Sequence, residues 1–407
     1  MPTLLQINFV VNSGSTGRIA EQLGAYVQNR GWNSFIAYGR NERPSVSQKI
    51  KIGSPLVSFV HAVGSILLDA QGLFSVCATK RLINQIMRIR PDVIHLHNLH
   101  GDYLNYRILF TFLAEQNIPV VWSFHDCWPI TGHCTHFEYV NCMRWQTECY
   151  ACPQLKMYPR SIGLDRSRAN YLAKKESFTS VSDLTVVAVS EWLKGVVQAS
   201  FLKEKAICRI YNGLDTDAFY PKDTRKAVAL KYGIQRTFWV IGVASIWSGR
   251  KGLSDILSLS KLVDCDTQFI LVGVSEKQLR ILPSNVIGIK RTEDTSALAD
   301  LYAASDVFIN PSPEETFGLT TAESLSCGTP VIVCNTTASP ELVTHETGFV
   351  VEPHDFDAMH AALLTVRKKG TGSYEQACRA YALTHFKKED MLQAYYHLYT
   401  YLLSRQS

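Results

Sequence analysis

Short, mostly apolar runs recur along the amino-terminal half of the chain, and polar turns and amphipathic stretches separate them. Runs of this length and composition are typical of parallel strands that are covered on both faces. The expected strands lie at residues 4–11, 93–96, 120–124, 185–189 and 207–211, and the expected helices between them include 18–29, 78–89 and 107–116. Alternating strands and helices predict a doubly wound parallel sheet.

The second half of the chain repeats this alternation without repeating the sequence. Its expected strands lie at 238–244, 268–272, 286–289, 306–309 and 331–333, and a tyrosine-rich helix is expected at 388–403. A chain of 407 residues is too long for one compact core. We therefore expect an α/β protein of two Rossmann-like domains. The first comprises 1–217 with the terminal segment 388–407, and the second comprises 218–387.

Composition and charge add mild constraints. Hydrophobic residues make up 46% of the chain and charged residues 19%, as in an ordinary globular protein, and the formal net charge is +5. This charge does not require nucleic acid, and we expect no such partner; it suits an anionic donor and an anionic membrane face. The amino terminus lacks a basic region and a cleavage site, and polar residues interrupt the apolar stretch 55–76. We expect a cytoplasmic protein, with peripheral association at the inner face of the membrane.

Candidate chemistry concentrates in the segment NPSPEETFGLTTAE, residues 310–323. It follows an expected strand, so Glu315 is expected in the loop at a strand's carboxyl end and Glu323 inside the next helix. Gly318 lets the backbone come close to a ligand, and the free N–H groups that open the helix form an anion site. Two carboxylates beside an anion site suit a sugar nucleotide, which carries both hydroxyls and phosphates. An ordinary loop with two solvated glutamates is the alternative.

The spacing of Glu315 and Glu323 resembles the Glu-x7-Glu signature of retaining, GT4-type glycosyltransferases of the GT-B fold. The resemblance implies two domains that face an interdomain cleft, with the C-terminal helix returning to the first domain. It assigns Glu315 to the donor sugar and Glu323 to the nucleotide ribose. The donor diphosphate would meet the backbone between them, at Phe317, Gly318 and Leu319.

A second loop, SGRKG at residues 248–252, follows the first strand of the second half. It presents two cations in a glycine loop: Arg250 can grip a diphosphate bidentately, and Lys251 acts as a point charge. The loop resembles the Lys-Gly phosphate site of the same family. Arg250 and Lys251 are therefore expected to bind the donor and to stabilise its departing diphosphate. A solvated charged turn is the alternative.

Two positions depart from the family pattern. Thr316 stands where the family usually has glycine, which narrows the space near the sugar and leaves the donor open. Ile246 stands where the family usually has arginine, and we expect Arg250 to substitute for it.

Two further candidates lie in the first half, at the carboxyl ends of expected strands. Gly14 and Gly17 occupy a turn between a strand and a helix, the opening of a nucleotide-binding unit. In GT4-like enzymes the matching loop packs under the donor diphosphate. His125 follows an apolar strand and resembles the acceptor-side histidine of GT4 enzymes, which contacts the transferred sugar. A plain tight turn and a structural histidine are the alternatives.

Four cysteines form a separate feature within an insertion expected at 127–160. They are spaced as Cys134-x7-Cys142-x6-Cys149-x2-Cys152 in a chain of 11 cysteines with no apparent export signal. This pattern fits a structural four-cysteine zinc site, although the outer spacings are unusual for zinc modules. Free thiols and disulfides are the alternatives.

Basic residues outnumber acidic ones between residues 143 and 178, and aromatic residues are interleaved with them. The basic set is Arg144, Lys156, Arg160, Arg166, Arg168, Lys174 and Lys175. This set predicts a surface that faces the membrane or a lipid diphosphate acceptor. A solvated surface without such a partner is the alternative.

These patterns and the resemblance together predict retaining transfer of a hexosyl unit from a nucleotide-diphosphate sugar. The acceptor would be a glycan or a polyprenyl-diphosphate-linked chain in exopolysaccharide or other cell-surface polysaccharide biosynthesis. The implied catalytic residues are His125, Glu315, Arg250 and Lys251, with no metal cofactor in catalysis. No general base is assigned, because the leaving phosphate is expected to accept the proton. The alternatives are a nucleotide-sugar epimerase or hydrolase, which would need an added acid/base pair, and a non-catalytic glycan- or nucleotide-binding protein.

Overall fold

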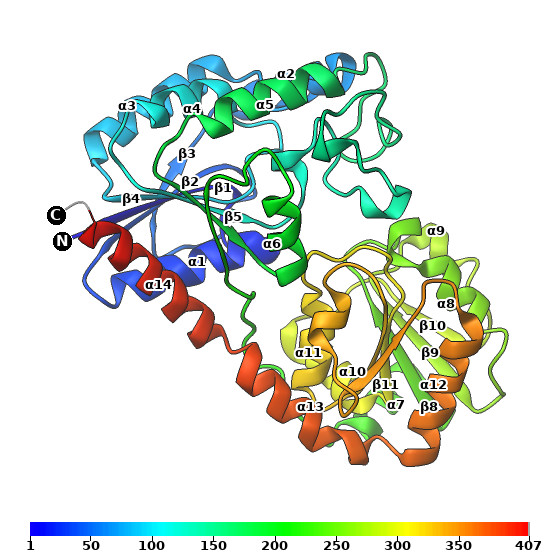
Figure 1. Ribbon diagram of the computed structural model, residues 1–407. Helices are drawn as coiled ribbons and strands as arrows, with labels where there is room; N and C mark the ends of the chain where they lie inside the picture. Colours follow the sequence, from blue (N-terminus) through cyan, green and yellow to red (C-terminus); the bar gives the residue numbers. More distant parts are fainter. Residues whose placement is uncertain (406–407) are drawn as a thin grey trace. The chain divides into compact units, whose positions relative to one another are not determined.

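The structure is a computed structural model that describes residues 1–405 and divides into two compact units (Figure 1). Unit 1 comprises residues 1–210 and the chain from Leu392 onward, and unit 2 comprises residues 211–391. The sequence placed these boundaries at 217/218 and 387/388. Each unit contains one parallel sheet with its own helices.

Unit 1 is built on a seven-stranded parallel sheet with the strand order β3-β2-β1-β4-β5-β6-β7. The strands are β1 (Thr3–Val10), β2 (Asn33–Arg40), β3 (Gln48–Lys51), β4 (Val93–Leu96), β5 (Val120–Phe124), β6 (Leu184–Ala188) and β7 (Ala206–Arg209). The helices are α1 (Gly14–Gln28), α2 (Pro55–Leu68), α3 (Val76–Ile89), α4 (Tyr106–Ala114), α5 (Ser167–Thr179) and α6 (Glu191–Gln198). The central strands β4 and β5 are buried along their whole length, as their apolar runs predicted.

Unit 2 repeats this order in a six-stranded parallel sheet, β10-β9-β8-β11-β12-β13. The strands are β8 (Phe238–Val243), β9 (Thr267–Val272), β10 (Val286–Ile289), β11 (Val307–Asn310), β12 (Val331–Cys334) and β13 (Gly348–Val351). The helices are α7 (Arg225–Tyr232), α8 (Leu253–Leu259), α9 (Glu276–Leu279), α10 (Thr295–Ala304), α11 (Leu319–Ser326), α12 (Phe356–Lys369) and α13 (Gly372–His385).

In both sheets the strand order reverses beside the first strand, between β1 and β4 in unit 1 and between β8 and β11 in unit 2. Ligands of such sheets bind beyond the carboxyl ends of the strands at this reversal. The fold therefore predicts that ligands bind at the loops after these four strands.

The last helix, α14 (Lys388–Ser404), returns to the first unit, as expected from the sequence. Tyr399 and Tyr395 on this helix are buried, and their hydroxyls bond to His95 at 2.7 Å and to Ser123 at 2.6 Å. These contacts with β4 and β5 account for two of the four tyrosines of the segment.

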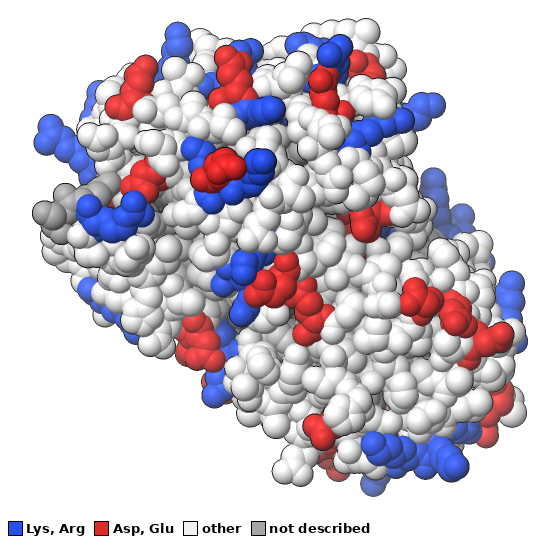
Figure 2. Space-filling model, in the orientation of Figure 1, with Lys and Arg blue, Asp and Glu red and all other residues white. Residues whose placement is uncertain are grey.

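Several elements differ from the sequence prediction. The sequence did not identify β2, β3 or β13, and it began the first helix at residue 18, whereas α1 begins at Gly14. The apolar stretch 55–76 is not one helix, because α2 ends at Leu68 and Asp69 takes a left-handed conformation. Within residues 1–405, no helix has both the length and the apolar character needed to cross a membrane. On the face shown in Figure 2, basic and acidic side chains are interspersed.

Candidate functional site

In unit 2 the loops after β8 and β11 are joined by a cluster of side-chain contacts. The Lys251 ammonium forms an ion pair with the Glu315 carboxylate. Arg250 donates to the carbonyl oxygen of Glu314 at 2.7 Å, and the Ser312 hydroxyl donates to the carbonyl oxygen of Arg250 at 3.0 Å. The sequence placed Arg250 and Lys251 on one loop and Glu315 on another, and the structure brings the two loops together.

The charges in this cluster favour an ionised Glu315. Burial on its own would raise the pKa of Glu315, but Lys251 and then Arg250 outweigh it and hold the pKa below its ordinary value. The Glu315 backbone is also fixed, because its N–H donates to the Thr337 hydroxyl at 2.9 Å. The site therefore presents a fixed carboxylate and two cations at the carboxyl ends of β8 and β11.

Glycines make the close packing of these loops possible. Gly252 has φ +70°, and a Cβ atom there would lie 2.6 Å from the carbonyl oxygen of Pro311, so no other residue fits without displacing the backbone. Gly318 has φ +99° and immediately precedes α11. Gly318 therefore lies directly before the helix that carries Glu323, and its expected close approach to a ligand stays a prediction.

Glu323 is held by a residue that the sequence analysis missed. The buried hydroxyl of Tyr302 donates to Glu323 Oε2 at 3.1 Å. Burial and then the charge of Glu323 raise the pKa of Tyr302, so the hydroxyl remains a donor. Nothing in the spacing of Tyr302 and Glu323, 21 residues apart, signals this contact. Phe317 is buried and packs against Tyr211 and Phe386, which anchors the backbone between the two glutamates.

In unit 1 the expected site residue His125 lies directly after β5, beside the buried His97 that directly follows β4. Its Nε2 atom is 3.2 Å from Nδ1 of His97, and the two rings are nearly parallel. Burial lowers the pKa of His125 to about 4, and the neighbouring Asp126 opposes this shift only in part. Asp126 is paired with His100 at 2.7 Å. His125 is therefore a neutral imidazole at neutral pH.

The two N-terminal candidates, Gly14 and Gly17, lie within α1 and not in a loop before it. Gly17 packs against the end of β1, where a Cβ atom would lie 2.9 Å from Cγ2 of Val10 and 3.2 Å from the Asn12 nitrogen. The expected glycine loop is therefore wrong in its extent, because the tight contact between strand and helix lets α1 begin four residues earlier than predicted. Their role in donor binding stays a prediction.

The four cysteines of the insertion line one small pocket of about 10 Å³. The Cys134 and Cys152 thiols share a hydrogen bond, and the Cys149 sulfur accepts one from the Gly132 N–H at 3.2 Å. As placed, the residues from 1 to 405 include no group of three or more His, Cys, Asp or Glu side chains arranged to hold a metal ion. Zinc binding thus stays a prediction that would require the sulfurs to converge.

The basic set between 143 and 178 is not one surface. Lys174 is buried and donates to the carbonyl oxygens of Trp128 at 2.7 Å and Thr131 at 2.9 Å. Burial lowers the pKa of Lys174 to about 7. The expectation that this residue faces a membrane, an acceptor or solvent is therefore wrong, since α5 turns it into the interior.

Both halves of the chain match models of known protein families. Residues 16–218 match the family model described as Glycosyltransferase Family 4, and residues 237–369 match the model described as Glycosyl transferases group 1. The chain is 24% identical over 371 residues to the colanic acid biosynthesis glycosyl transferase WcaC of Escherichia coli K12. That alignment covers 86% of this chain and 88% of the relative.

Solved structures share the fold at low sequence identity. Sucrose-phosphate synthase from Thermosynechococcus elongatus superposes with a TM-score of 0.76 at 17% identity, over 100% of both chains. Anabaena HepE, in complex with UDP and glucose, superposes with a TM-score of 0.68 at 16% identity, over 98% of this chain and 99% of that one. These matches confirm the GT-B fold. The glycosyltransferase family models and the WcaC match do not favour the alternatives of an epimerase, a hydrolase or a non-catalytic binding protein. The chain belongs to the GT4-type, group 1 glycosyltransferases.

Proposed function

We propose that this glycosyltransferase moves a hexosyl unit, with retention of configuration, from a nucleoside-diphosphate sugar to a glycan or lipid-linked acceptor in surface polysaccharide biosynthesis. The observation that carries the proposal is the contact cluster joining Arg250 and Lys251 to the Glu315 loop. The UDP-and-glucose complex of HepE and the colanic acid biosynthesis role named for WcaC support this class of donor and acceptor.

The cluster supplies what departure of a diphosphate requires. As the bond between the sugar and the diphosphate breaks, negative charge grows on the phosphate oxygens, and two fixed cations stabilise it without reorganising. The acceptor oxygen bonds to the same carbon, and its proton passes to the leaving phosphate, so the protein needs no general base. Arg250 and Lys251 supply the positive charge, and we propose that catalysis requires no metal ion.

The two glutamates have different tasks in this scheme. Glu315 stays ionised and accepts hydrogen bonds from the sugar, whose ring gains positive charge during transfer. Glu323, oriented by Tyr302, holds the ribose, which is bound alike before and during transfer. His125 acts as a neutral contact on the acceptor side, where the sugar is received.

A thermal-shift screen of nucleotide sugars tests the proposal, because a donor bound only by the native state raises the melting temperature. UDP-glucose, GDP-mannose and ADP-glucose form a first panel. We expect one of them to raise Tm in the wild type and to lose this effect in Lys251→Ala. Lys290→Ala, which removes an exposed lysine of unit 2 that pairs with Glu276, is the matched control. A donor that stabilises Lys251→Ala as well as the wild type would contradict the assignment.

A membrane-facing surface accompanies this function. Helix α2 carries no charged residue over Pro55–Leu68, and large apolar side chains project from it into solvent. The neighbouring segment at Ile162 and Leu164 is bonded along the end of α2 and adds two more. The apolar patch comprises Leu56, Phe59, Val60, Val63, Leu67, Leu68, Ile162 and Leu164.

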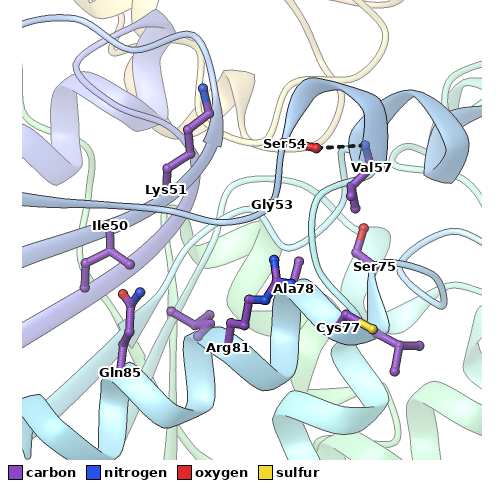
Figure 3. Close-up of a pocket in the computed structure, with 12 residues that line it drawn as sticks. Ile50, Lys51, Gly53, Ser54, Val57, Ser75, Cys77, Ala78, Arg81 and Gln85 are labelled. Carbon is purple, nitrogen blue, oxygen red and sulfur yellow. Dashed lines mark hydrogen bonds between the residues drawn. The ribbon is translucent and has the colours of Figure 1, made fainter.

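Beside this patch lies a pocket of about 510 Å³ that Lys51 and Arg81 line together with the start of α2 (Figure 3). Apolar side chains next to two cations are complementary to a membrane surface that carries anionic headgroups. We therefore propose that the apolar patch docks on an anionic membrane and that a lipid-linked acceptor reaches the enzyme there.

Sedimentation with vesicles tests this docking. Phe59→Asp should reduce binding to phosphatidylglycerol vesicles by several-fold, because it buries a charge in the contact. Leu230→Asp, at an apolar residue of unit 2 that is 87% exposed, should leave binding unchanged. Equal binding of wild type and Phe59→Asp would refute the proposed face. Equal binding to neutral phosphatidylcholine would refute the role of the cations.

We also propose one structural zinc ion in the cysteine pocket. Besides the four cysteines, three buried polar atoms without a hydrogen-bond partner line this pocket: His133 Nε2, Trp145 Nε1 and Ser167 Oγ. The other nitrogen of His133 donates to Asp69 at 2.5 Å, an arrangement that leaves the Nε2 lone pair to the pocket. A pocket of about 10 Å³ has room for one atom-sized occupant.

Elemental analysis of protein purified without chelator tests the zinc proposal. We expect about one zinc per chain, lost in Cys149→Ser and retained in Cys265→Ser, which changes an exposed cysteine of unit 2. Zinc removal should lower Tm. Protein without zinc would refute the site, and thiol counting would then separate free thiols from disulfides.

A further inference from the structure

A chain of buried polar groups runs from α1 through β1 and β4 to the candidate site residue His125. Gln6 on β1 and His97 beyond β4 are both essentially inaccessible to solvent, and His125 at the end of β5 is partly exposed. Three hydrogen bonds connect these groups: one between the Ala20 carbonyl and Gln6, one between Gln6 and His97, and one between His97 and His125.

The direction of every bond in this chain follows from its first member. The Ala20 carbonyl oxygen can only accept, so the Gln6 amide directs its Nε2 donor to Ala20 at 2.7 Å. This orientation places Gln6 Oε1 at 3.1 Å from His97 Nε2. Since an amide oxygen can only accept, His97 carries its proton on Nε2.

The same reasoning passes from His97 to His125. Burial, and then the neighbouring His95 and His125, lower the pKa of His97, so its ring is neutral and its Nδ1 atom is an acceptor. The Nε2 atom of His125, 3.2 Å away, must then be the donor. A neutral His125 that is protonated on Nε2 has its lone pair on Nδ1.

We propose that Gln6 and His97 are positioning residues that hold His125 in the Nε2-protonated tautomer. Whatever hydrogen bond His125 makes at Nδ1, it makes as an acceptor. In the transfer reaction, His125 would accept a hydrogen bond from a sugar hydroxyl and would not deliver a proton through Nδ1. This last role rests on the proposed function, whereas the tautomer does not.

A second buried network provides the matched control. His95 is held by the Tyr399 hydroxyl and by Ser123. Its ring lies beside that of His97, with a centroid distance of 4.0 Å and a tilt of 36°. Tyr399→Phe removes a buried hydrogen bond of 2.7 Å from the same layer of the unit but leaves Gln6, His97 and His125 in contact. It therefore reports any general effect of weakening the interior.

The test is the tautomer of each ring, read from long-range proton–nitrogen correlations of protein labelled with ¹⁵N-histidine. Signals are assigned with His97→Gln and His125→Gln. In the wild type at neutral pH, both rings should carry the proton on Nε2. Gln6→Met, which keeps the side-chain volume and removes both polar groups, should give a mixture of tautomers at His125, and Tyr399→Phe should not.

Activity provides the second readout. Gln6→Met should lower kcat by roughly tenfold with little change in the donor KM, as expected for loss of an outer-shell partner. A wild-type His97 protonated on Nδ1 would overturn the proposal, and this measurement needs no variant to fold. An unchanged His125 tautomer in folded Gln6→Met would also overturn it. If the wild type transfers no sugar while both tautomers are as expected, the proposed function fails and the tautomer assignment stands.

Discussion

The two sheets have the same strand order at their reversal points but opposite chemistry. At the ends of β4 and β5 in unit 1, His97 and His125 are hydrogen-bonded imidazoles whose pKa values are lowered by burial, and the adjacent Asp126 is paired with His100. At the ends of β8 and β11 in unit 2, Lys251 pairs with Glu315, and Lys251 and then Arg250 hold the pKa of Glu315 below its ordinary value against the effect of burial. One backbone arrangement thus supports a neutral polar site in one unit and an ionic site in the other.

We call the carboxyl ends of β4 and β5 the neutral edge and the carboxyl ends of β8 and β11 the ionic edge. The difference between them follows from where each edge finds hydrogen-bond partners for its polar groups. In unit 1 the histidine rings bond to buried partners, Gln6 and the tyrosines of α14. Because the rings are neutral, burying them carries no desolvation penalty for a charge. In unit 2 the hydrogen bonds come from two loops that contact each other, so charge is tolerated there. Neutral acceptors suit sugar hydroxyls, and fixed cations suit a diphosphate.

The largest effect should come from Lys251→Ala, which breaks the ionic edge. We expect transfer to fall by about 10³-fold, since it removes a charge fixed against the departing diphosphate and leaves Glu315 without its partner. Calorimetric titration with UDP or another nucleoside diphosphate should show weakened binding. Undiminished binding would contradict the role given to this lysine. Lys290→Ala, an exposed lysine in the same unit, serves as the control.

Glu315→Gln and Glu323→Gln should separate the two carboxylates. The first should lower kcat by about 10²-fold, because the interaction it removes strengthens as the sugar gains charge. The second should mainly raise the donor KM, because the ribose is bound alike in both states. Steady-state kinetics with both variants checks the assignment. The opposite pattern would mean that the roles of the two glutamates are reversed. Unchanged kcat and KM in both variants would contradict a catalytic role for the ionic edge.

The sequence predicted the ionic edge better than the neutral one. Arg250, Lys251 and Glu315 lie in local motifs with a glycine or a strand end beside them, so short-range pattern was enough to single them out. The Gln6–His97–His125 chain joins three strands that are far apart in sequence, and a buried glutamine on an apolar strand gives no local signal. The same limit explains Lys174, whose burial depends on how α5 packs against the Trp128 turn.

Element prediction shows the same dependence on locality. β4, β5 and β10 were placed to the residue, because each is a short apolar run with polar residues close to both ends. β3 was missed because exposed polar and charged residues surround its one buried residue, Ile50. β2 was missed although its interior is largely buried, because small and polar residues such as Ser34 and Gly39 shorten its apolar run. The start of α1 was misplaced because Gly14 and Gly17 predict a turn, whereas here they allow the helix to approach β1.

Acid should distinguish the edges through stability. The pKa of His125 is about 4 in the native state and about 6.5 when unfolded, so between these values the unfolded state binds more protons. The contribution of His125 to the free energy of unfolding is therefore fully present above about pH 6.5 and is lost as pH falls toward 4. The loss amounts to about 2 kcal/mol after allowance for the partial exposure of the ring. Glu315, with its lowered pKa, loses its contribution only below about pH 4.3.

Urea denaturation at several pH values between 8 and 4 measures this loss. His125→Gln should flatten the decline between pH 6.5 and 4, and Glu315→Gln should leave that range unchanged. A wild-type midpoint that stays constant down to pH 4.5 would mean that the imidazoles at the unit 1 edge are not held neutral.

The smallest effect should come from the first glycine of positive φ after the leading strand of each sheet. Gly14 and Gly252 have similar positive φ values, +62° and +70°, but no atom lies within 4 Å of a Cβ at Gly14, whereas the Pro311 oxygen would lie 2.6 Å from a Cβ at Gly252. Gly14→Ala should therefore cost only the backbone strain, about 1 kcal/mol, and Gly252→Ala about 2 kcal/mol because the joined loops must also separate. Calorimetric titration with a nucleoside diphosphate should show weaker binding for Gly252→Ala and nearly unchanged binding for Gly14→Ala. If Gly14→Ala weakens binding as much as Gly252→Ala, the donor phosphates depend on both edges, and the division into a neutral and an ionic edge fails.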